Sequence, residues 1–205
     1  MRSTMCKLVG TLACAAALAS ATYSARSAVV TFDFDELEPF AVGTPFSVTE
    51  NGLTASFTTP DGAIFFIVPS FFPPDLTGNV LFAFDPDPHT LIVQFDQDVE
   101  AISLVFALNA EDETAMFSLQ ALLDGSVVGT TSATGTISSP LLFPVGTISF
   151  SETAFDTLVL TSTAEDFSID VLQVTVDTQA VPAPATLALL GIALAGLGFN
   201  RRRRP

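Results

Sequence analysis

The chain has 205 residues, and its 22 acidic side chains outnumber the seven basic ones, which leaves a formal net charge of −15. All seven basic residues lie within 1–26 and 201–204, whereas every acidic residue lies between Asp33 and Asp177. The body of the chain therefore has no lysine or arginine with which to form a salt bridge, and its charge repels nucleic acid and anionic membrane surfaces. We expect no nucleic-acid partner. The acidic surface either keeps an exported protein soluble or has its carboxylates bridged by divalent cations.

Residues 1–28 predict a secretory signal peptide. Arg2 and Lys7 form a positive n-region, residues 8–18 form an apolar h-region, and Ala19-Ser20-Ala21 is a small-residue cleavage site. We expect the secretory translocon to export the chain and cleavage to follow Ala21, with cleavage at 27–28 as the alternative.

Both cysteines, Cys6 and Cys14, lie inside this segment. The mature protein consequently has no thiol, which excludes a disulfide framework, a zinc–thiolate site and a cysteine nucleophile. We expect an exported domain that is held together by its core or by a metal.

Residues 29–177 predict one all-β domain with enough chain to bury a sizeable core. Period-2 alternation of apolar side chains recurs between turn dipeptides such as Asn51-Gly52 and Asp124-Gly125, and no convincing amphipathic helix is found. Short strands at this spacing are typical of a β-sandwich, and we expect a single jelly-roll-like domain. The predicted strands are 29–36, 53–58, 63–68, 79–84, 90–96, 100–108, 115–122, 126–131, 146–150, 156–162 and 166–176.

The last predicted strand changes its apolar phase partway along. Phe167, Ile169 and Val171 share one face, whereas the apolar residues from Leu172 onward share the other. A β-bulge at that point would keep both sets pointing inward and would re-aim Asp170.

The body lacks most of the side chains that catalysis needs. It has no cysteine, lysine, arginine or tyrosine, and its only histidine, His89, lies in a proline-rich turn where we expect it to be solvated. A carboxylate pair for glycoside hydrolysis is compatible with the many acids, but the chain has no tryptophan and its only tyrosine is Tyr23. We therefore expect no enzyme and no high-affinity carbohydrate site, whereas weaker binding through aspartate and asparagine stays open.

The chain has 19 phenylalanines, and most of them alternate within predicted strands, which favours a place in the core. The cluster formed by Phe65-Phe66 and Phe71-Phe72-Pro73-Pro74 is either a loop folded onto the core or an exposed binding patch.

Calcium is the best candidate ligand, because a hard cation prefers several oxygen ligands and acids gather in the first and last predicted strands. The hypothetical calcium ligands are Asp35, Glu36 and Asp170. The stretch 167–171 is similar to the closing strand of carbohydrate-binding and adhesive jelly-roll modules, and this resemblance implies a structural calcium between neighbouring first and last strands. The alternative is that these acids are separate and solvated. A second candidate cluster consists of Asp96, Asp98 and Glu100.

Residues 178–205 combine a linker, a proline pair, an apolar run and a basic cluster. The prolines disfavour helix upstream of the apolar run 187–199, and the arginines that follow it favour the cytoplasmic side of a membrane. As a helix, 185–199 would span about 22 Å, which is shorter than the hydrocarbon core of roughly 30 Å. We expect a transmembrane helix that inserts only transiently into the inner membrane.

The order of these parts resembles the PEP-CTERM sorting signal of Gram-negative bacteria. The residues that carry the resemblance are Val181, Pro182, Pro184, Arg201, Arg202, Arg203 and Arg204. Ala183 stands where the family has a glutamate, and this departure bears on processing rather than on membership. The resemblance implies export, processing by an exosortase, an inner-membrane intermediate and a final place at the cell surface or in an extracellular matrix. An ordinary C-terminal anchor helix is the alternative.

These features predict a non-enzymatic, exported protein with a structural or adhesive role at the cell surface or in a biofilm matrix with exopolysaccharide. A weak calcium-dependent carbohydrate-binding module is the alternative function. A hydrolase with a carboxylate pair is the third.

Overall fold

The computed structural model describes residues 26–60, 62–71, 76–83, 89–111, 113–137 and 143–178. The predicted signal peptide up to residue 25 and the predicted sorting segment from residue 179 lie outside the described residues. Ser27–Asp177 forms one compact unit.

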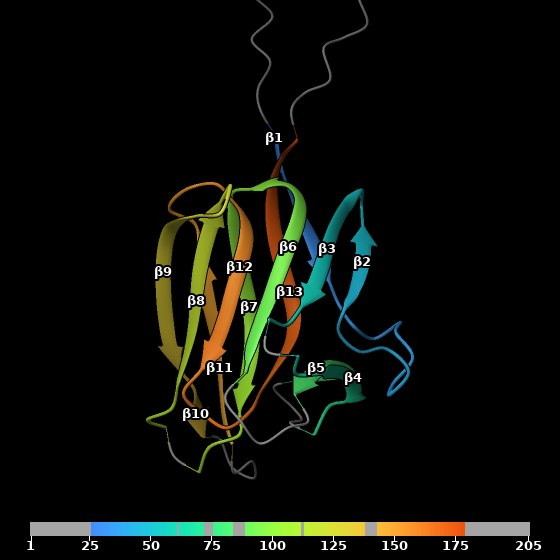
Figure 1. Ribbon diagram of the computed structural model, residues 1–205, viewed down its shortest axis with the longest axis vertical. Coiled ribbons are helices and arrows are strands. Elements are labelled where there is room, and N and C mark those ends of the chain that lie inside the picture. Colours follow the sequence, from blue (N-terminus) through green and yellow to red (C-terminus); the bar gives the residue numbers. More distant parts are fainter. Residues whose placement is uncertain are drawn as a thin grey trace, which may run out of the picture. The chain divides into compact units, whose positions relative to one another are not determined.

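The described strands are β1 (Arg26–Phe32), β2 (Phe46–Glu50), β3 (Leu53–Thr58), β4 (Phe65–Pro69), β5 (Asn79–Ala83), β6 (Thr90–Val99), β7 (Ala101–Leu108), β8 (Met116–Leu123), β9 (Ser126–Thr134), β10 (Thr136–Ile137), β11 (Pro144–Phe150), β12 (Phe155–Ser162) and β13 (Phe167–Thr178). They form two antiparallel sheets that pack as a sandwich, and the described residues include no helix (Figure 1). The seven-stranded sheet has the order β10-β11-β7-β13-β5-β4, with β1 pairing with β13. The six-stranded sheet has the order β2-β3-β6-β12-β8-β9. The predicted all-β sandwich is thus confirmed.

The strand order is that of a jelly roll. The strands β11, β7, β13 and β5 lie side by side in the seven-stranded sheet, and β6, β12, β8 and β9 do so in the six-stranded sheet. Along the chain from β5 to β13, most connections cross from one sheet to the other, which is the double Greek-key arrangement. Before this core, β4 forms a hairpin with β5, while β2 and β3 extend the six-stranded sheet.

Two predicted turn dipeptides form tight hairpins. Asn51 and Gly52 have φ angles of 50° and 85° between β2 and β3, and Asp124 and Gly125 have φ angles of 50° and 76° between β8 and β9. Positive φ at both central residues is what the type I′ turn requires, and this turn matches the right-handed twist of the strands that it joins.

Two strands were missing from the sequence prediction. β2 alternates between half-buried and exposed residues and has no fully buried side chain, because it lies at the edge of the six-stranded sheet. β10 is only two residues long and pairs with Pro144 and Val145 of β11. Neither segment has the strong apolar alternation on which the prediction depended.

Phenylalanine rings fill much of the space between the sheets. Phe106 and Phe117 stack with centroids 4.6 Å apart, and both Phe117 and Phe65 contact Phe167 at 5.1 Å. All four rings are at most 1% exposed. Burial of rings of this size contributes about 2–3 kcal/mol each to stability. The interpretation of the strand phenylalanines as core is therefore confirmed for these residues.

The predicted β-bulge in the last strand is also confirmed. The pairing of β13 with β7 shifts in register between Ile169 and Leu172. Phe167 and Ile169 before the shift, and Leu172 and Val174 after it, are all buried in one core. The irregularity lets these four residues face inward, whereas Val171, which was predicted to share the face of Phe167 and Ile169, is only half-buried, and Asp170 lies within the irregularity.

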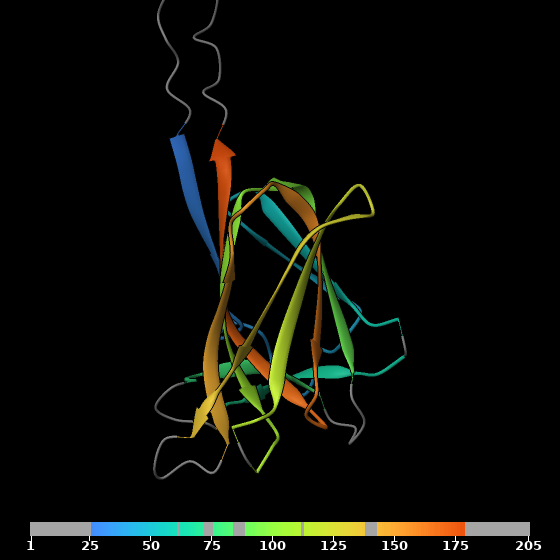
Figure 2. The ribbon, with the colours of Figure 1, turned by 90° about the vertical axis from the view of Figure 1, so that its left-hand side faces the viewer.

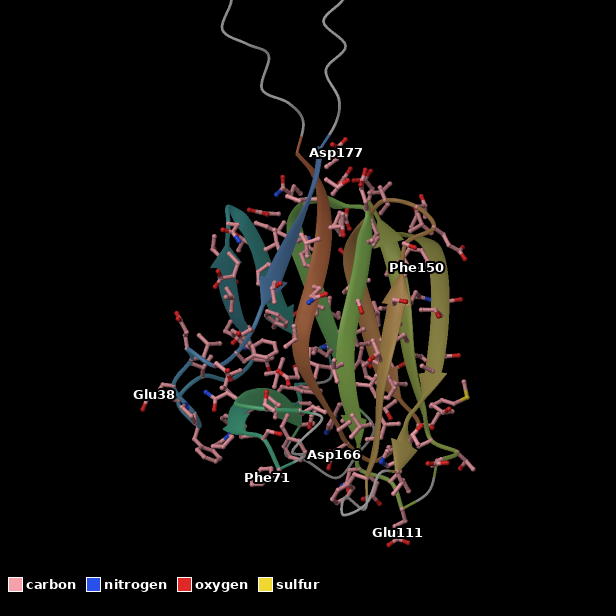
Figure 3. All side chains as sticks on the ribbon, turned by 180° about the vertical axis from the view of Figure 1, so that it is seen from behind. Glu38, Phe71, Glu111, Phe150, Asp166 and Asp177 are labelled. Atoms are coloured by element: carbon pink, nitrogen blue, oxygen red, sulfur yellow. The ribbon has the colours of Figure 1, made fainter. Side chains whose placement is uncertain are left out.

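The first and last strands lie side by side, as expected for a jelly roll (Figure 2). β1 begins at Arg26, and its residues Val30 and Phe32 are buried. Cleavage after Ala21 would leave this strand whole, whereas cleavage at 27–28 would remove its first residues. Seen from behind, Asp177 lies at one end of the unit, whereas Asp166, Phe71 and Glu111 lie at the opposite end (Figure 3).

Candidate functional site

Two of the three predicted calcium ligands contact the same short turn, residues 77–79, which leads into β5. The backbone N–H of Asn79 donates to Oδ1 of Asp35 at 2.6 Å, and the backbone N–H of Thr77 donates to Oδ2 of Asp170 at 3.2 Å. Gly78 lies between these donors with a φ of 67°. The carboxylates that follow β1 and belong to β13 thus both bind this turn.

The side chain of Asn79 ties the same turn to the exit of β1. Its Nδ2 donates to the carbonyl oxygens of Leu37 and Asp35 at 3.1 and 3.2 Å. The backbone N–H of Asp35 in turn donates to Oδ1 of Asp33 at 2.8 Å. Sequence reasoning treated Asn79 only as the start of a strand, because no local pattern links it to a segment 44 residues away.

Asp170 is a buried acid, and its side chain is only 5% exposed. Burial raises the pKa of its carboxyl above the ordinary aspartate value, and the negative charges of Asp35 and Asp33 raise it further. The hydrogen bond from Thr77 acts in the opposite direction, because it favours the ionised form. No lysine or arginine lies between residues 27 and 200 to offset this negative charge.

The third predicted ligand, Glu36, is exposed. In the described part of the chain, no group of three or more histidine, cysteine, aspartate or glutamate side chains has an arrangement that could hold a metal ion. The carboxylates of Asp35 and Asp170 already accept backbone hydrogen bonds, which is a role in the fold that needs no cation. Calcium binding by Asp35, Glu36 and Asp170 stays a prediction.

Other acids from the sequence analysis also contact the backbone. The backbone carbonyl of Asp166 accepts from the N–H of Asn109 at 2.9 Å, and its carboxylate oxygen Oδ2 accepts from Nδ2 of Asn109 at 3.3 Å, so that the end of β7 is tied to the start of β13. Asp96 of the second candidate cluster is exposed and accepts from the backbone N–H of Thr54 at 3.0 Å.

His89 does not have the solvated position that we expected. It is 8% exposed, and its ring lies edge-on to the buried ring of Phe65, with the centroids 6.3 Å apart. The prediction was wrong because the neighbouring prolines indicate a turn but carry no information about the side chains that pack on it.

The phenylalanine-rich segment is divided between core and surface. Phe65 is fully buried, and Phe66 is half-buried in a second apolar cluster that includes Val68 and Leu76. Phe71 is 60% exposed. The remaining residues of the segment, 72–75, lie outside the described residues.

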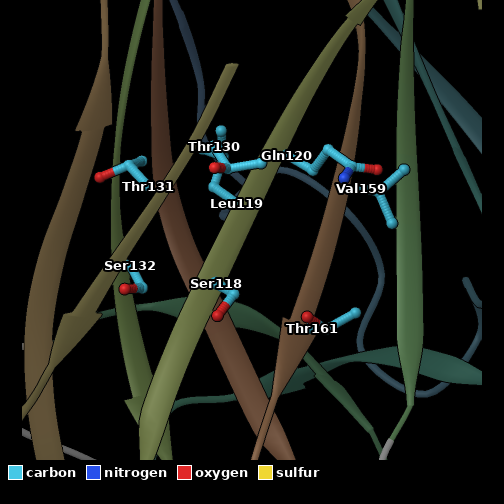
Figure 4. A pocket seen from close by; sticks show the side chains of 8 residues that line it. All are labelled: Ser118, Leu119, Gln120, Thr130, Thr131, Ser132, Val159 and Thr161. Atoms are coloured by element: carbon cyan, nitrogen blue, oxygen red, sulfur yellow. The ribbon is translucent and has the colours of Figure 1, made fainter. Parts of the chain in front are cut away.

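A pocket of about 430 Å³ lies on the outer face of the six-stranded sheet (Figure 4). We call it the hydroxyl pocket, and it is lined by Ser118, Leu119, Gln120, Thr130, Thr131, Ser132, Val159 and Thr161. Phe117 and Ala121, which alternate along β8 with the polar residues of the pocket, point into the core. Ser118 and Gln120 alternate with apolar residues in the predicted strand 115–122, but this alternation alone does not reveal a site, because it does not show which strands lie beside it.

The C-terminal residues 180–204 match the model of the PEP-CTERM protein-sorting motif. The chain carries a PEP-CTERM sorting motif. The resemblance found in the sequence is thereby confirmed, and the motif implies an exported, cell-surface protein that an exosortase processes. Among the described residues no helix is both long and apolar enough to cross a membrane. The predicted transmembrane segment 187–199 lies outside them.

No curated protein matches the chain. Among solved structures, the catalytic domain of a GH87 alpha-1,3-glucanase in complex with nigerose is 14% identical, with a TM-score of 0.38 over 78% of this chain and 31% of that chain. The enzymatically active domain of bacteriophage CBA120 tailspike protein 4 is 13% identical, with a TM-score of 0.37 over 60% and 19%. The VP2 subviral particle of infectious bursal disease virus is 11% identical, with a TM-score of 0.27 over 74% and 52%. The chain spans about half of these proteins or less, and the likeness concerns the fold alone.

Proposed function

We propose that this protein is a non-enzymatic structural or adhesive component of the cell surface or of a biofilm matrix that contains exopolysaccharide. The observation that carries the proposal is the attachment of a PEP-CTERM motif, at residues 180–204, to a β-sandwich domain. The secretory translocon and an exosortase are the partners during export. The C-terminal segment holds the chain in the inner membrane until it is processed.

The contacts of the titratable residues support a role without catalysis. His89 is buried, and its ring packs against that of Phe65. Asp35 and Asp170 both accept hydrogen bonds from the turn at 77–79, so they are occupied in holding backbone. The segment from residue 27 to residue 177 also has no lysine, arginine, cysteine or tyrosine. A cysteine, lysine or tyrosine nucleophile and a lysine or arginine that stabilises negative charge in a transition state are therefore absent from this segment.

A weak calcium-dependent carbohydrate-binding module is the second candidate function. The uncharged hydroxyl pocket favours carbohydrate as the ligand. The placement of Asp35 and Asp170 at one turn favours that turn as the place for a cation, which would offset the repulsion between the two carboxylates.

Deletion of the gene in the producing bacterium tests the proposed function. The wild-type protein is expected to fractionate with the matrix polysaccharide, and the deletion strain is expected to lose matrix cohesion or surface attachment, which the wild-type gene restores. Recovery of the protein only from the inner membrane would contradict the proposal. Hydrolysis of the matrix polysaccharide by the purified protein would contradict its non-enzymatic part.

A further inference from the structure

We infer that the hydroxyl pocket binds an uncharged polysaccharide. The biological setting of this inference rests on the proposed matrix function, whereas its chemistry rests on the described side chains of β8, β9 and β12. These strands are neighbours in the six-stranded sheet, so the pocket has a floor of regular, hydrogen-bonded backbone. Side chains on such a floor are held in position even when no ligand is bound.

The polar side chains of the pocket form two rows across three strands. The first row consists of Thr161, Ser118 and Ser132, which are register partners. The second row consists of the polar residues Gln120 and Thr130 together with the apolar Val159, and these three are also register partners. Strands lie about 4.8 Å apart, and two residues along a strand advance about 6.8 Å. The two rows therefore cover an area comparable with that of a disaccharide.

The hydrogen-bonding groups of these rows are available to a ligand. On the same sheet, the hydroxyls of Ser47 and Ser56 pair with each other at 2.9 Å, and those of Thr49 and Thr54 pair at 3.0 Å. Within the described residues, the polar side chains of the two pocket rows have no such partner. Register partners that could pair therefore do so at β2–β3 but leave their donors and acceptors unused at β8–β9 and β8–β12.

The side chains of the two rows are also exposed enough for a ligand to reach their hydrogen-bonding groups. Thr130 and Ser132 are exposed, while Ser118, Gln120 and Thr161 are half-buried. A ligand that lies across the rows would reach every one of these groups. Hydroxyl and amide groups both donate and accept hydrogen bonds, as sugar hydroxyls do, so that each can pair in either direction.

The charge of the protein favours an uncharged polysaccharide over anionic ligands. The pocket lining has no acidic or basic residue, whereas the chain between Asp33 and Asp177 has 22 acids. Anionic polysaccharides and nucleic acids would be repelled by this body and would find no lysine or arginine in it. A protein partner would need aromatic or arginine anchors, and the lining has only Leu119 and Val159 as apolar residues. An uncharged polyhydroxylated chain is the ligand that these groups match.

The pocket is built for weak binding. It has no aromatic ring on which a sugar could stack, so affinity depends on hydrogen bonds that replace those with water. Each such exchange contributes little, and we expect dissociation constants in the millimolar range for a disaccharide. Many copies of the protein attached to one cell surface would still hold a polysaccharide firmly, because linked sites bind it with a combined affinity greater than that of a single site.

The test is a titration of the exported protein, labelled with ¹⁵N, followed by NMR. The probes are uncharged gluco-oligosaccharides with α- and β-linkages, and galacturonic acid oligosaccharides serve as the anionic comparison. We expect saturable shifts at Ser118, Gln120, Thr130 and Ser132 with at least one uncharged probe and none with the anionic one. A double variant, Thr130→Val with Thr161→Val, keeps the side-chain shape and removes two hydroxyls, and it should bind about tenfold more weakly.

Thr134→Val is the matched control, because Thr134 lies on the same strand and face of β9 but outside the pocket lining. It should leave the affinity unchanged, and well-dispersed spectra of all variants would show that they fold. Absence of saturable shifts with every uncharged probe would overturn the inference. Equal affinity of the double variant, or shifts that centre on the turn at 77–79, would also overturn it. A protein that binds in this assay but is absent from the matrix would contradict the proposed function and leave the pocket assignment standing.

Discussion

The contact of Gly78 with Asp35 gives the sharpest test of the turn that joins β1, β5 and β13. Gly78 has a φ of 67°, and a Cβ atom added to it would collide with the carboxylate of Asp35. That carboxylate is held in place by the backbone N–H of Asn79 at 2.6 Å. We therefore expect Gly78→Ala to impose backbone strain and also to displace the Asp35 side chain from its hydrogen bond.

The magnitude follows from these two contributions. A non-glycine residue in the left-handed region costs about 1–2 kcal/mol, and loss of a hydrogen bond at an exposed acceptor costs about 1 kcal/mol. Gly125→Ala is the matched control, because Gly125 has a φ of 76° but no atom within 4 Å of its added Cβ. It should incur the strain alone, so that the two variants differ by about 1 kcal/mol. For a unit of this size, that difference lowers the thermal midpoint by roughly 2–4 °C.

Urea denaturation of the exported wild-type protein and both variants measures the free energies of unfolding. Combining Gly78→Ala with Asp35→Ala should cost less than the sum of the two single changes, because each removes the same hydrogen bond. Equal destabilisation by Gly78→Ala and Gly125→Ala would refute the reasoning, since it would mean that Asp35 does not confine the turn. Full additivity of the double variant would refute it as well.

Three further outcomes are expected. Because burial raises the pKa of Asp170 in the folded state, the native protein retains a proton that the unfolded chain loses above the ordinary value of 3.8. Stability should then fall as pH rises from 3.8 towards the raised pKa. Asp170→Asn should lack this fall and be more stable than wild type at neutral pH, unlike the exposed control Asp98→Asn, and parallel pH profiles of wild type and Asp170→Asn would contradict this. Calcium should raise the thermal midpoint, and Asp170→Ala should lose that gain; identical midpoints with calcium and with a chelator would remove the calcium site. Replacement of the arginines at 201–204 with serine should prevent correct retention and processing, and an unchanged mature mass and location would count against exosortase sorting.

Much of the fold could be predicted because its signals are local. Alternation of apolar residues along 116–123 predicts a strand whichever strands become its neighbours, and Asp124-Gly125 predicts the tight turn that follows. The phase change in the last strand predicted its bulge for the same reason, since only an irregularity lets Ile169 and Leu172 share one core. The edge strand β2 escaped prediction because it is short and has only two apolar residues, Phe46 and Val48, in alternation with polar ones.

The candidate sites were less accessible to such reasoning because they are assembled from distant segments. Asp35 and Asp170 were named together from an expected neighbourhood of the first and last strands, and the structure does bring both to one turn. The acceptor role of these acids and the part of Asn79 could not be foreseen, because backbone donors leave no mark in a sequence. The burial of His89 was likewise hidden, since its environment comes from β4.

The sequence by itself determined the sorting signal of this protein and the absence of lysine and arginine from its body. The PEP-CTERM motif is a contiguous stretch that can be read without a fold, and the confinement of every lysine and arginine to the chain ends is a matter of composition. Only the tertiary structure decided which polar side chains hold the backbone and which remain available. The hydroxyls on β2 and β3 pair with each other, whereas those on β8, β9 and β12 do not, because the spacing and orientation of side chains across a sheet depend on register and twist.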